Sequence, residues 1–158
     1  MIFKALDGST FSLEILGYEF PENNCDIYSL NWLMLRVVAK DAEQVVVWDT
    51  VEQYMDTYGA YYLHIWLTQI ANRNLIPLHI QTGWIDELYF DVIEITESVS
   101  LSIKCRYCRF IDGHLVTIRS HFNYEIDLQD FKAAVEQWQS DIEKFPTRVN
   151  LYGTTLFL

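Results

Sequence analysis

The stretch SVSLSIKCRYCRFIDGHLVTIRSHFNYEI, residues 98–126, decides the fold, because apolar and polar side chains alternate on both sides of one dipeptide. Apolar side chains stand at every second position from 99 to 107 and at nearly every second position from 116 to 126. This period of two is typical of a strand with one buried face. Asp112-Gly113 separates the two runs, and Asp-Gly between alternating strands predicts a hairpin with a type I′ turn.

The chain before this hairpin contains further strand patterns. Phe11, Leu13 and Ile15 alternate with polar residues, the run 30–38 is almost continuously apolar, and 44–54 is rich in β-branched and aromatic residues. The run 88–95 alternates and then shifts phase at Ile93, which is what a β-bulge would produce.

Two segments change to the helical period. Apolar residues recur at helical spacing over about 57–73, where Asp56 or Thr57 is available as N-cap, and over about 127–145, where Asp127 stands at the N-cap. The order strands, helix, strands, helix predicts an α+β fold, in which an antiparallel sheet of about six to eight strands carries two helices. Without a linker, residues 1–158 are expected to form one domain, and the apolar tail 149–158 is expected to add a strand.

Composition excludes several classes of protein. Hydrophobic residues make up 51% of the chain, which is too apolar for a disordered protein. No apolar run is long enough to cross a membrane, and the N-terminus does not resemble a signal peptide. Three cysteines argue for a reducing compartment, which predicts a cytoplasmic protein. The formal net charge of −11 disfavours nucleic acid as a ligand, because phosphate is bound by Lys and Arg.

Negative charge is concentrated in one region of the sequence. Residues 41–97 carry a net charge of −9, whereas residues 98–126 carry +2. This acidic region is either a solvated face that keeps the protein soluble or a binding surface for a cationic partner.

No catalytic or metal-binding constellation stands out. Cys105 and Cys108 form a C-x-x-C pair on a strand, where positions three apart point to opposite faces, and a second pair of ligands at zinc-finger spacing is missing. The histidines are scattered, and His64 is interpreted as a packed helix residue. The sequence therefore predicts a protein without enzymatic activity, metal or cofactor.

The N-terminal third resembles a known family. Leu6-Asp7-Gly8-Ser9, then Gly17-Tyr18-Glu19-Phe20-Pro21, then Asn31-Trp32-Leu33 are similar to the WapI-type immunity proteins of bacterial polymorphic toxin systems, and the likeness extends over about 6–148. The resemblance implies a small cytosolic protein that binds and neutralises a cognate toxin C-terminal domain, often a nuclease, and is not an enzyme. These motifs themselves are interpreted as scaffold, with Trp32 in the core.

The two lines of reasoning combine into one hypothesis for the site. An acidic, aromatic-rich surface within 41–97 is expected to bind a basic toxin, with aromatic anchors and steering charges. Its expected exposed residues are Asp49, Glu52, Trp84, Glu87, Tyr89, Asp91 and Glu94. On the strand around Phe90, the residues Glu87, Tyr89 and Asp91 should point outward together.

Two alternatives remain open. A small-molecule-binding α+β domain would use Tyr58, Tyr61, Tyr62 and Trp66 to line an aromatic pocket. A hydrolase with unrecognised catalytic residues is the weaker reading. The sequence does not identify the toxin or the oligomeric state.

Overall fold

The computed structural model of the chain describes residues 1–20, 29–74, 78–82 and 87–148. The first group of strands is β1 Ile2–Lys4, β2 Thr10–Tyr18, β3 Trp32–Lys40 and β4 Val46–Asp56, with a short 3-10 helix, η1 Ser29–Asn31, before β3. The second group is β5 His79–Thr82, β6 Glu87–Ile95, β7 Ser98–Ile111 and β8 His114–Asp127. The helices are α1 Thr57–Ala71, between the two groups, and α2 Leu128–Ile142, after the second.

Each group of strands forms its own antiparallel sheet. Sheet A has the order β1-β2-β3-β4, and sheet B has the order β5-β6-β7-β8, so neighbours in the sequence are neighbours in space. The α+β class and the antiparallel strands are thus confirmed, and the strands are divided between two sheets. The expected strand at 149–158 lies outside the described residues.

Local features of sheet B follow the sequence. Pairing between β6 and β7 shifts register between Val92 and Glu94, which confirms the bulge at Ile93. Asp112 and Gly113 have φ values of 51° and 78°. Positive φ at both central residues is the requirement of a type I′ turn, so the predicted hairpin is confirmed.

Both helices begin directly after an aspartate that caps the N-terminus, as predicted. The Asp56 carboxylate accepts a hydrogen bond from the Gly59 N–H (2.7 Å), and the Asp127 carboxylate accepts one from the Gln129 N–H (2.7 Å). Each bond satisfies one of the backbone donors that a helix N-terminus leaves unpaired. The helices end at Ala71 and Ile142, slightly before the predicted ends.

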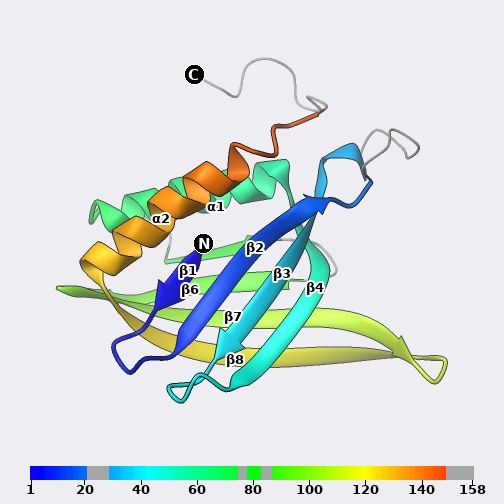
Figure 1. The fold of residues 1–158 in the computed structure, drawn as a ribbon, viewed down its shortest axis with the longest axis horizontal. Helices are drawn as coiled ribbons and strands as arrows, with labels where there is room; N and C mark the ends of the chain where they lie inside the picture. Colours follow the sequence, from blue (N-terminus) through cyan, green and yellow to red (C-terminus); the bar gives the residue numbers. More distant parts are fainter. Residues whose placement is uncertain (21–28, 75–77, 83–86, 149–158) are drawn as a thin grey trace.

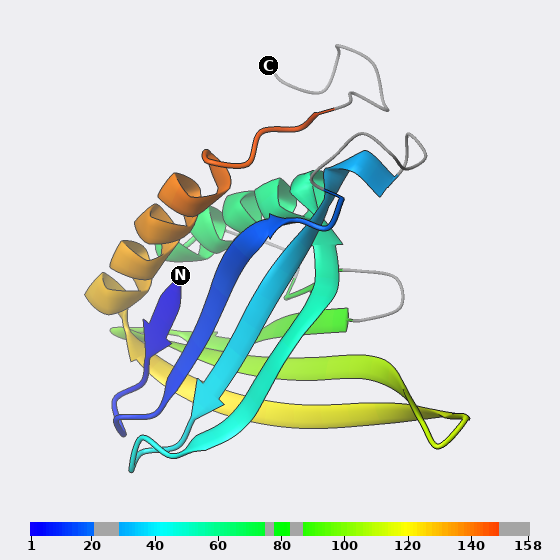
Figure 2. The same cartoon turned by 45° about the vertical axis from the view of Figure 1, so that its right-hand side comes forward.

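Sheet A and the helices pack on the same face of sheet B. Figure 1 and Figure 2 show the strands of sheet A crossing over sheet B, with α1 and α2 side by side next to sheet A. The inner face of sheet B therefore meets both partners: Phe90 contacts Phe11 of β2 at 6.2 Å and Trp66 of α1 at 6.4 Å between ring centroids. Leu88, Phe90, Leu101 and Ile103 are completely buried there.

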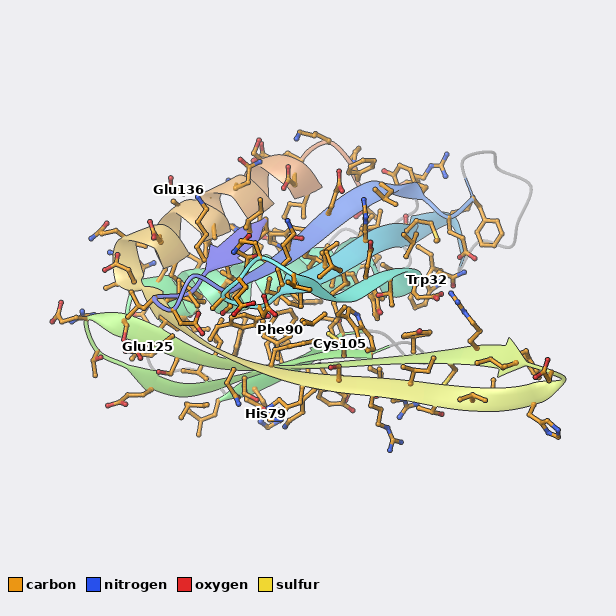
Figure 3. All side chains as sticks on the ribbon, turned by 60° about the horizontal axis from the view of Figure 1, so that its bottom comes forward. Trp32, His79, Phe90, Cys105, Glu125 and Glu136 are labelled. Carbon is orange, nitrogen blue, oxygen red and sulfur yellow. The ribbon has the colours of Figure 1, made fainter. Side chains whose placement is uncertain are left out.

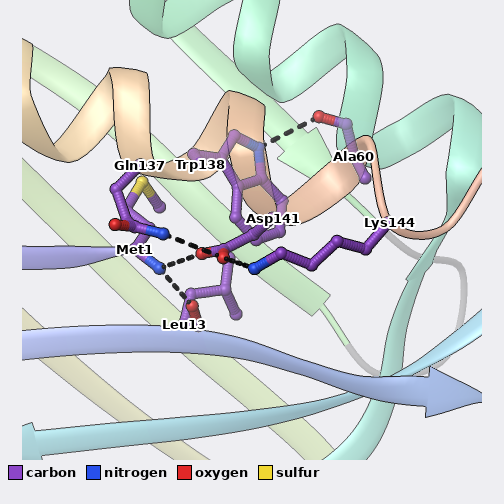
Figure 4. A network of polar contacts seen from close by, with 7 residues as sticks. All are labelled: Met1, Leu13, Ala60, Gln137, Trp138, Asp141 and Lys144. Carbon is purple, nitrogen blue, oxygen red and sulfur yellow. Dashed lines mark hydrogen bonds and ion pairs between the residues drawn. The ribbon is translucent and has the colours of Figure 1, made fainter.

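Polar contacts connect helix α2 to the N-terminal residue Met1 beside sheet A and to helix α1 (Figure 4). The amino group of Met1 donates to the Leu13 carbonyl and to the Asp141 carboxylate, both at 2.9 Å. The indole N–H of Trp138 donates to the Ala60 carbonyl of α1 (3.1 Å). Trp138 is fully buried, so this bond satisfies a donor that would otherwise be unpaired.

The prediction that Trp32 fills the core is wrong. Leu33 and Leu35 occupy the inner face of β3 and are buried, so the alternation turns Trp32 to the opposite face, where it is half-buried. Within the described ranges, no helix is long and apolar enough to cross a membrane.

Candidate functional site

The outer face of sheet B is a large surface that neither helix covers (Figure 3). It consists of the side chains that point away from sheet A, and His79, labelled in Figure 3, marks this side. Cross-strand pairs along the β7–β8 hairpin show which residues share it, because paired residues point to the same face. These pairs are Ser98–Asp127, Ser100–Glu125, Ser102–Asn123, Lys104–His121, Arg106–Arg119, Cys108–Thr117 and Phe110–Leu115.

The chemical character of this face changes along the β7–β8 hairpin. At the end near α2 it is acidic, since Glu94 of β6 pairs with Ser100, whose other neighbour is Glu125. Lys104, Arg106 and Arg119 form a basic band in the middle. The turn end is apolar and is described under the further inference.

Ion pairs connect the acids of β6 to the basic band. The carboxylate of Asp91 lies 2.7 Å from the Lys104 ammonium, and that of Glu87 lies 3.2 Å from the Arg106 guanidinium. Desolvation raises the pKa of Tyr89, and the Glu87 carboxylate raises it further because a phenolate beside it would be a second negative charge. Acids of β6 therefore neutralise two members of the basic band, Lys104 and Arg106.

The structure brings four of the predicted site residues together. Glu87, Tyr89, Asp91 and Glu94 all lie on the outer face of sheet B. The expectation that Glu87 is exposed is wrong, because only 7% of it is accessible beside Arg106.

The other predicted residues lie elsewhere. Asp49 is exposed on the outer face of sheet A, where Arg36 donates two hydrogen bonds to it (2.9 and 2.7 Å) and holds its pKa below the ordinary value. Glu52 pairs in register with the buried Leu35 and so points to the inner side of β4, where it is only partly exposed, contrary to expectation. Trp84 lies outside the described residues.

The acidic region 41–97 of the sequence does not form an equally acidic surface, because ion pairs neutralise part of its charge. Four acids of the region 41–97 form ion pairs with basic residues from outside that region. These pairs are Asp49–Arg36, Glu52–Arg109, Glu87–Arg106 and Asp91–Lys104. Glu43 and Glu94 are exposed and have no basic partner among the described residues.

The aromatic residues of α1 are divided between two grooves. Tyr58 and Tyr61 line a groove of about 420 Å³ between α1 and the C-terminal end of α2, and Tyr62 and Trp66 line one of about 510 Å³ between α1 and β5. The first groove also contains His64 and Thr68.

Two polar atoms in the α1–α2 groove have no hydrogen-bond partner among the residues that the structure describes. His64 Nδ1 and Thr68 Oγ1 are both buried and unpaired. Burial lowers the pKa of His64, against the opposing charge of Glu143. The groove can therefore offer a neutral imidazole and a hydroxyl to a polar ligand.

The C-x-x-C pair is split between the two faces of β7. Cys105 is buried and burial raises its pKa to about 12, whereas Cys108 is partly exposed on the outer face. The described part of the chain contains no group of three or more His, Cys, Asp or Glu side chains placed to hold a metal ion.

Sequence reasoning missed the turn end of the hairpin as a candidate binding element. The strand lengths point to it, since β7 and β8 have 14 residues each and β6 has nine. A hairpin longer than its neighbouring strand must extend past the sheet.

Comparison with known proteins gives one result. The sequence model of the immunity protein WapI-like family matches residues 1–146. Searches of curated proteins and of solved structures give no significant match.

Proposed function

The chain belongs to the WapI-like immunity protein family, and we propose that it binds and neutralises a cognate toxin domain through the outer face of sheet B. The observation that carries the proposal is that this face is free of both helices and contains four residues expected at the interface: Glu87, Tyr89, Asp91 and Glu94. A four-stranded face offers the area of a standard protein interface, about 800 Å² per partner.

The charge pattern suggests how the complex forms. The net charge of −11 gives a long-range attraction to a cationic partner. Glu94 and Glu125, which have no basic partner among the described residues, present exposed carboxylates at the acidic end of the face. A nuclease domain fits this proposal because it must present Lys and Arg to phosphate. The bacterial cytoplasm, where such a toxin would act, is the proposed place of action.

The test uses two double charge reversals of equal size. Asp91→Lys with Glu94→Lys alters the proposed face, whereas Glu43→Lys with Asp49→Lys makes the same change in net charge near β4 of sheet A. Affinity for the toxin domain encoded next to the gene is measured by calorimetry, and the fold is checked by circular dichroism. The first variant should bind at least about tenfold more weakly than the second.

Equal loss in both variants would show that only net charge matters, and unchanged binding in the first would place the interface elsewhere. Protection of cells that express the toxin should follow the same order as the affinities.

A second candidate function is binding of a small polar molecule in the α1–α2 groove. The unpaired His64 Nδ1 and Thr68 Oγ1 favour it, because buried polar atoms usually have partners. Native mass spectrometry of the purified protein should then show an additional bound mass that His64→Leu removes. A spectrum of the bare chain alone would count against this function and leave the toxin proposal unaffected.

A further inference from the structure

The turn end of the β7–β8 hairpin extends beyond the rest of sheet B (Figures 1 and 2). Strand β6 begins at Glu87, which pairs with Arg106, and Arg106 in turn pairs with Arg119. Beyond that point, residues 107–118 form a ribbon with no third strand among the residues that the structure describes. We call this ribbon the arm.

Both faces of the arm carry apolar side chains. Phe110 and Leu115 form a cross-strand pair on the outer face and are 73% and 61% exposed, and Ile111 on the inner face is 44% exposed. An isolated two-stranded ribbon is marginally stable in water, and exposed apolar side chains do not stabilise it. Exposed clusters of this kind mark interaction sites.

The arm is nevertheless held in place. At its base, Trp48 of β4 packs edge-on against Tyr107, with 5.4 Å between ring centroids. Arg109 lies over the Tyr107 ring at 5.5 Å and forms an ion pair with Glu52 at 3.6 Å. The type I′ turn closes the other end. These contacts position the arm before any partner arrives, which lowers the entropy cost of binding.

Given the proposed function, we propose that the arm is the anchor of the toxin interface, and that Phe110 and Leu115 insert into an apolar cleft of the toxin domain. The pair lies on the same outer face as Asp91 and Glu94, so one partner can contact the acidic end and the arm together. A projecting aromatic side chain next to arginine matches the composition of interface hot spots.

The arginines on and beside the arm predict the charge at the edge of that cleft. Arg119 is exposed beside its base and has no acidic partner among the described residues, and Arg109 is exposed on the inner face. The cleft should therefore carry carboxylates at its edge. A second copy of this chain is a poorer occupant, because two arms packed together would bring their arginines close to one another.

The experiment compares two double variants that each remove two exposed apolar side chains. Phe110→Ala with Leu115→Ala changes the arm, and Leu16→Ala with Val47→Ala changes residues of sheet A that are 49% and 50% exposed. Affinity for the toxin domain is measured with the full chain, along with urea denaturation and the mass in solution. The arm variant should bind at least about 30-fold more weakly, with the control variant near the wild type.

The outcomes separate the two proposals. If wild type and arm variant bind the toxin domain equally, the arm is not the anchor and the proposed function stands. If neither the wild type nor any variant binds the toxin domain, the proposed function fails and the arm proposal fails with it. A dimer that the arm mutations convert to a monomer, with toxin affinity unchanged, would assign the arm to self-association and overturn this inference.

Discussion

The two halves of one hairpin differ sharply in burial. In the half of β7–β8 near α2, the inner side chains Leu101, Ile103 and Ile126 are completely buried under sheet A and the helices. In the arm, Phe110 and Leu115 are mostly exposed. Both halves belong to the same two strands, but the regular alternation ends at Tyr107 and resumes at Val116, and the tip of the arm carries apolar side chains on both faces.

This difference shows that apolar residues on a strand do not by themselves reveal whether the rest of the fold covers them. The covered half stabilises the fold through apolar burial, worth about 25 cal/mol per Å². Phe110 and Leu115 at the tip of the arm gain little such stabilisation, so they are free to serve binding. The predictions below separate these two roles.

The largest effect should come from a pair of phenylalanines. Phe90, fully buried on the inner face of β6, is compared with Phe110 of the arm. Phe90→Ala should lower the free energy of unfolding by about 3–5 kcal/mol, because it leaves a cavity in the core. Phe110→Ala should change it by less than about 0.5 kcal/mol. Urea denaturation measures both, and similar losses would mean that the arm is part of the core.

The tryptophans extend the comparison to the other elements. Trp138 is buried and donates to Ala60, so Trp138→Ala should cost about 3–5 kcal/mol. Trp32 is half-buried on the outer face of sheet A, so Trp32→Ala should cost roughly half as much. Thermal and urea unfolding of the two variants decide this, and a larger loss for Trp32 would contradict the assignment of faces.

The ion pair at the base of the arm and the one on the arm should also differ in how much they stabilise the fold. Glu87 is buried beside Arg106, so Glu87→Gln should destabilise the protein by about 1–3 kcal/mol. Arg109 of the pair with Glu52 is 59% exposed, so Glu52→Gln should cost less than about 1 kcal/mol. Raising the salt concentration should reduce the Glu52 effect more than the Glu87 effect.

The last comparison concerns chemical reactivity and does not involve a change in stability. Cys105 lies in the covered half with a pKa of about 12, raised by burial, whereas Cys108 is partly exposed at the start of the arm. In a Cys25→Ser background at pH 8, a thiol reagent should modify Cys108 and react with Cys105 more than about 100-fold more slowly. Equal rates in the folded protein would place the boundary of the core elsewhere.

Much of the fold could be predicted from local signals. The type I′ turn at Asp112-Gly113, the bulge at Ile93 and the cap at Asp127 each depend on the chemistry of a few adjacent residues. The position of Trp32 was mispredicted, because hydrophobicity alone does not say which face of a strand is buried.

The candidate site could be predicted only in part. The alternation around Phe90 placed Glu87, Tyr89 and Asp91 on one face. The burial of Glu87 and the orientation of the Glu52 side chain toward Arg109 depend on residues that are distant in the sequence. Pairing between distant acids and bases therefore had no local signal.

The sequence by itself determined the strands, the helices and the turns of this protein, because backbone preferences, side-chain period and capping act over a few residues. Only the tertiary structure decided how the strands divide into two sheets, which charges are neutralised, and where the cover over sheet B ends. Those outcomes depend on how sheet A and the helices cross sheet B. The packing of whole elements leaves the arm exposed, and no single stretch of sequence specifies it.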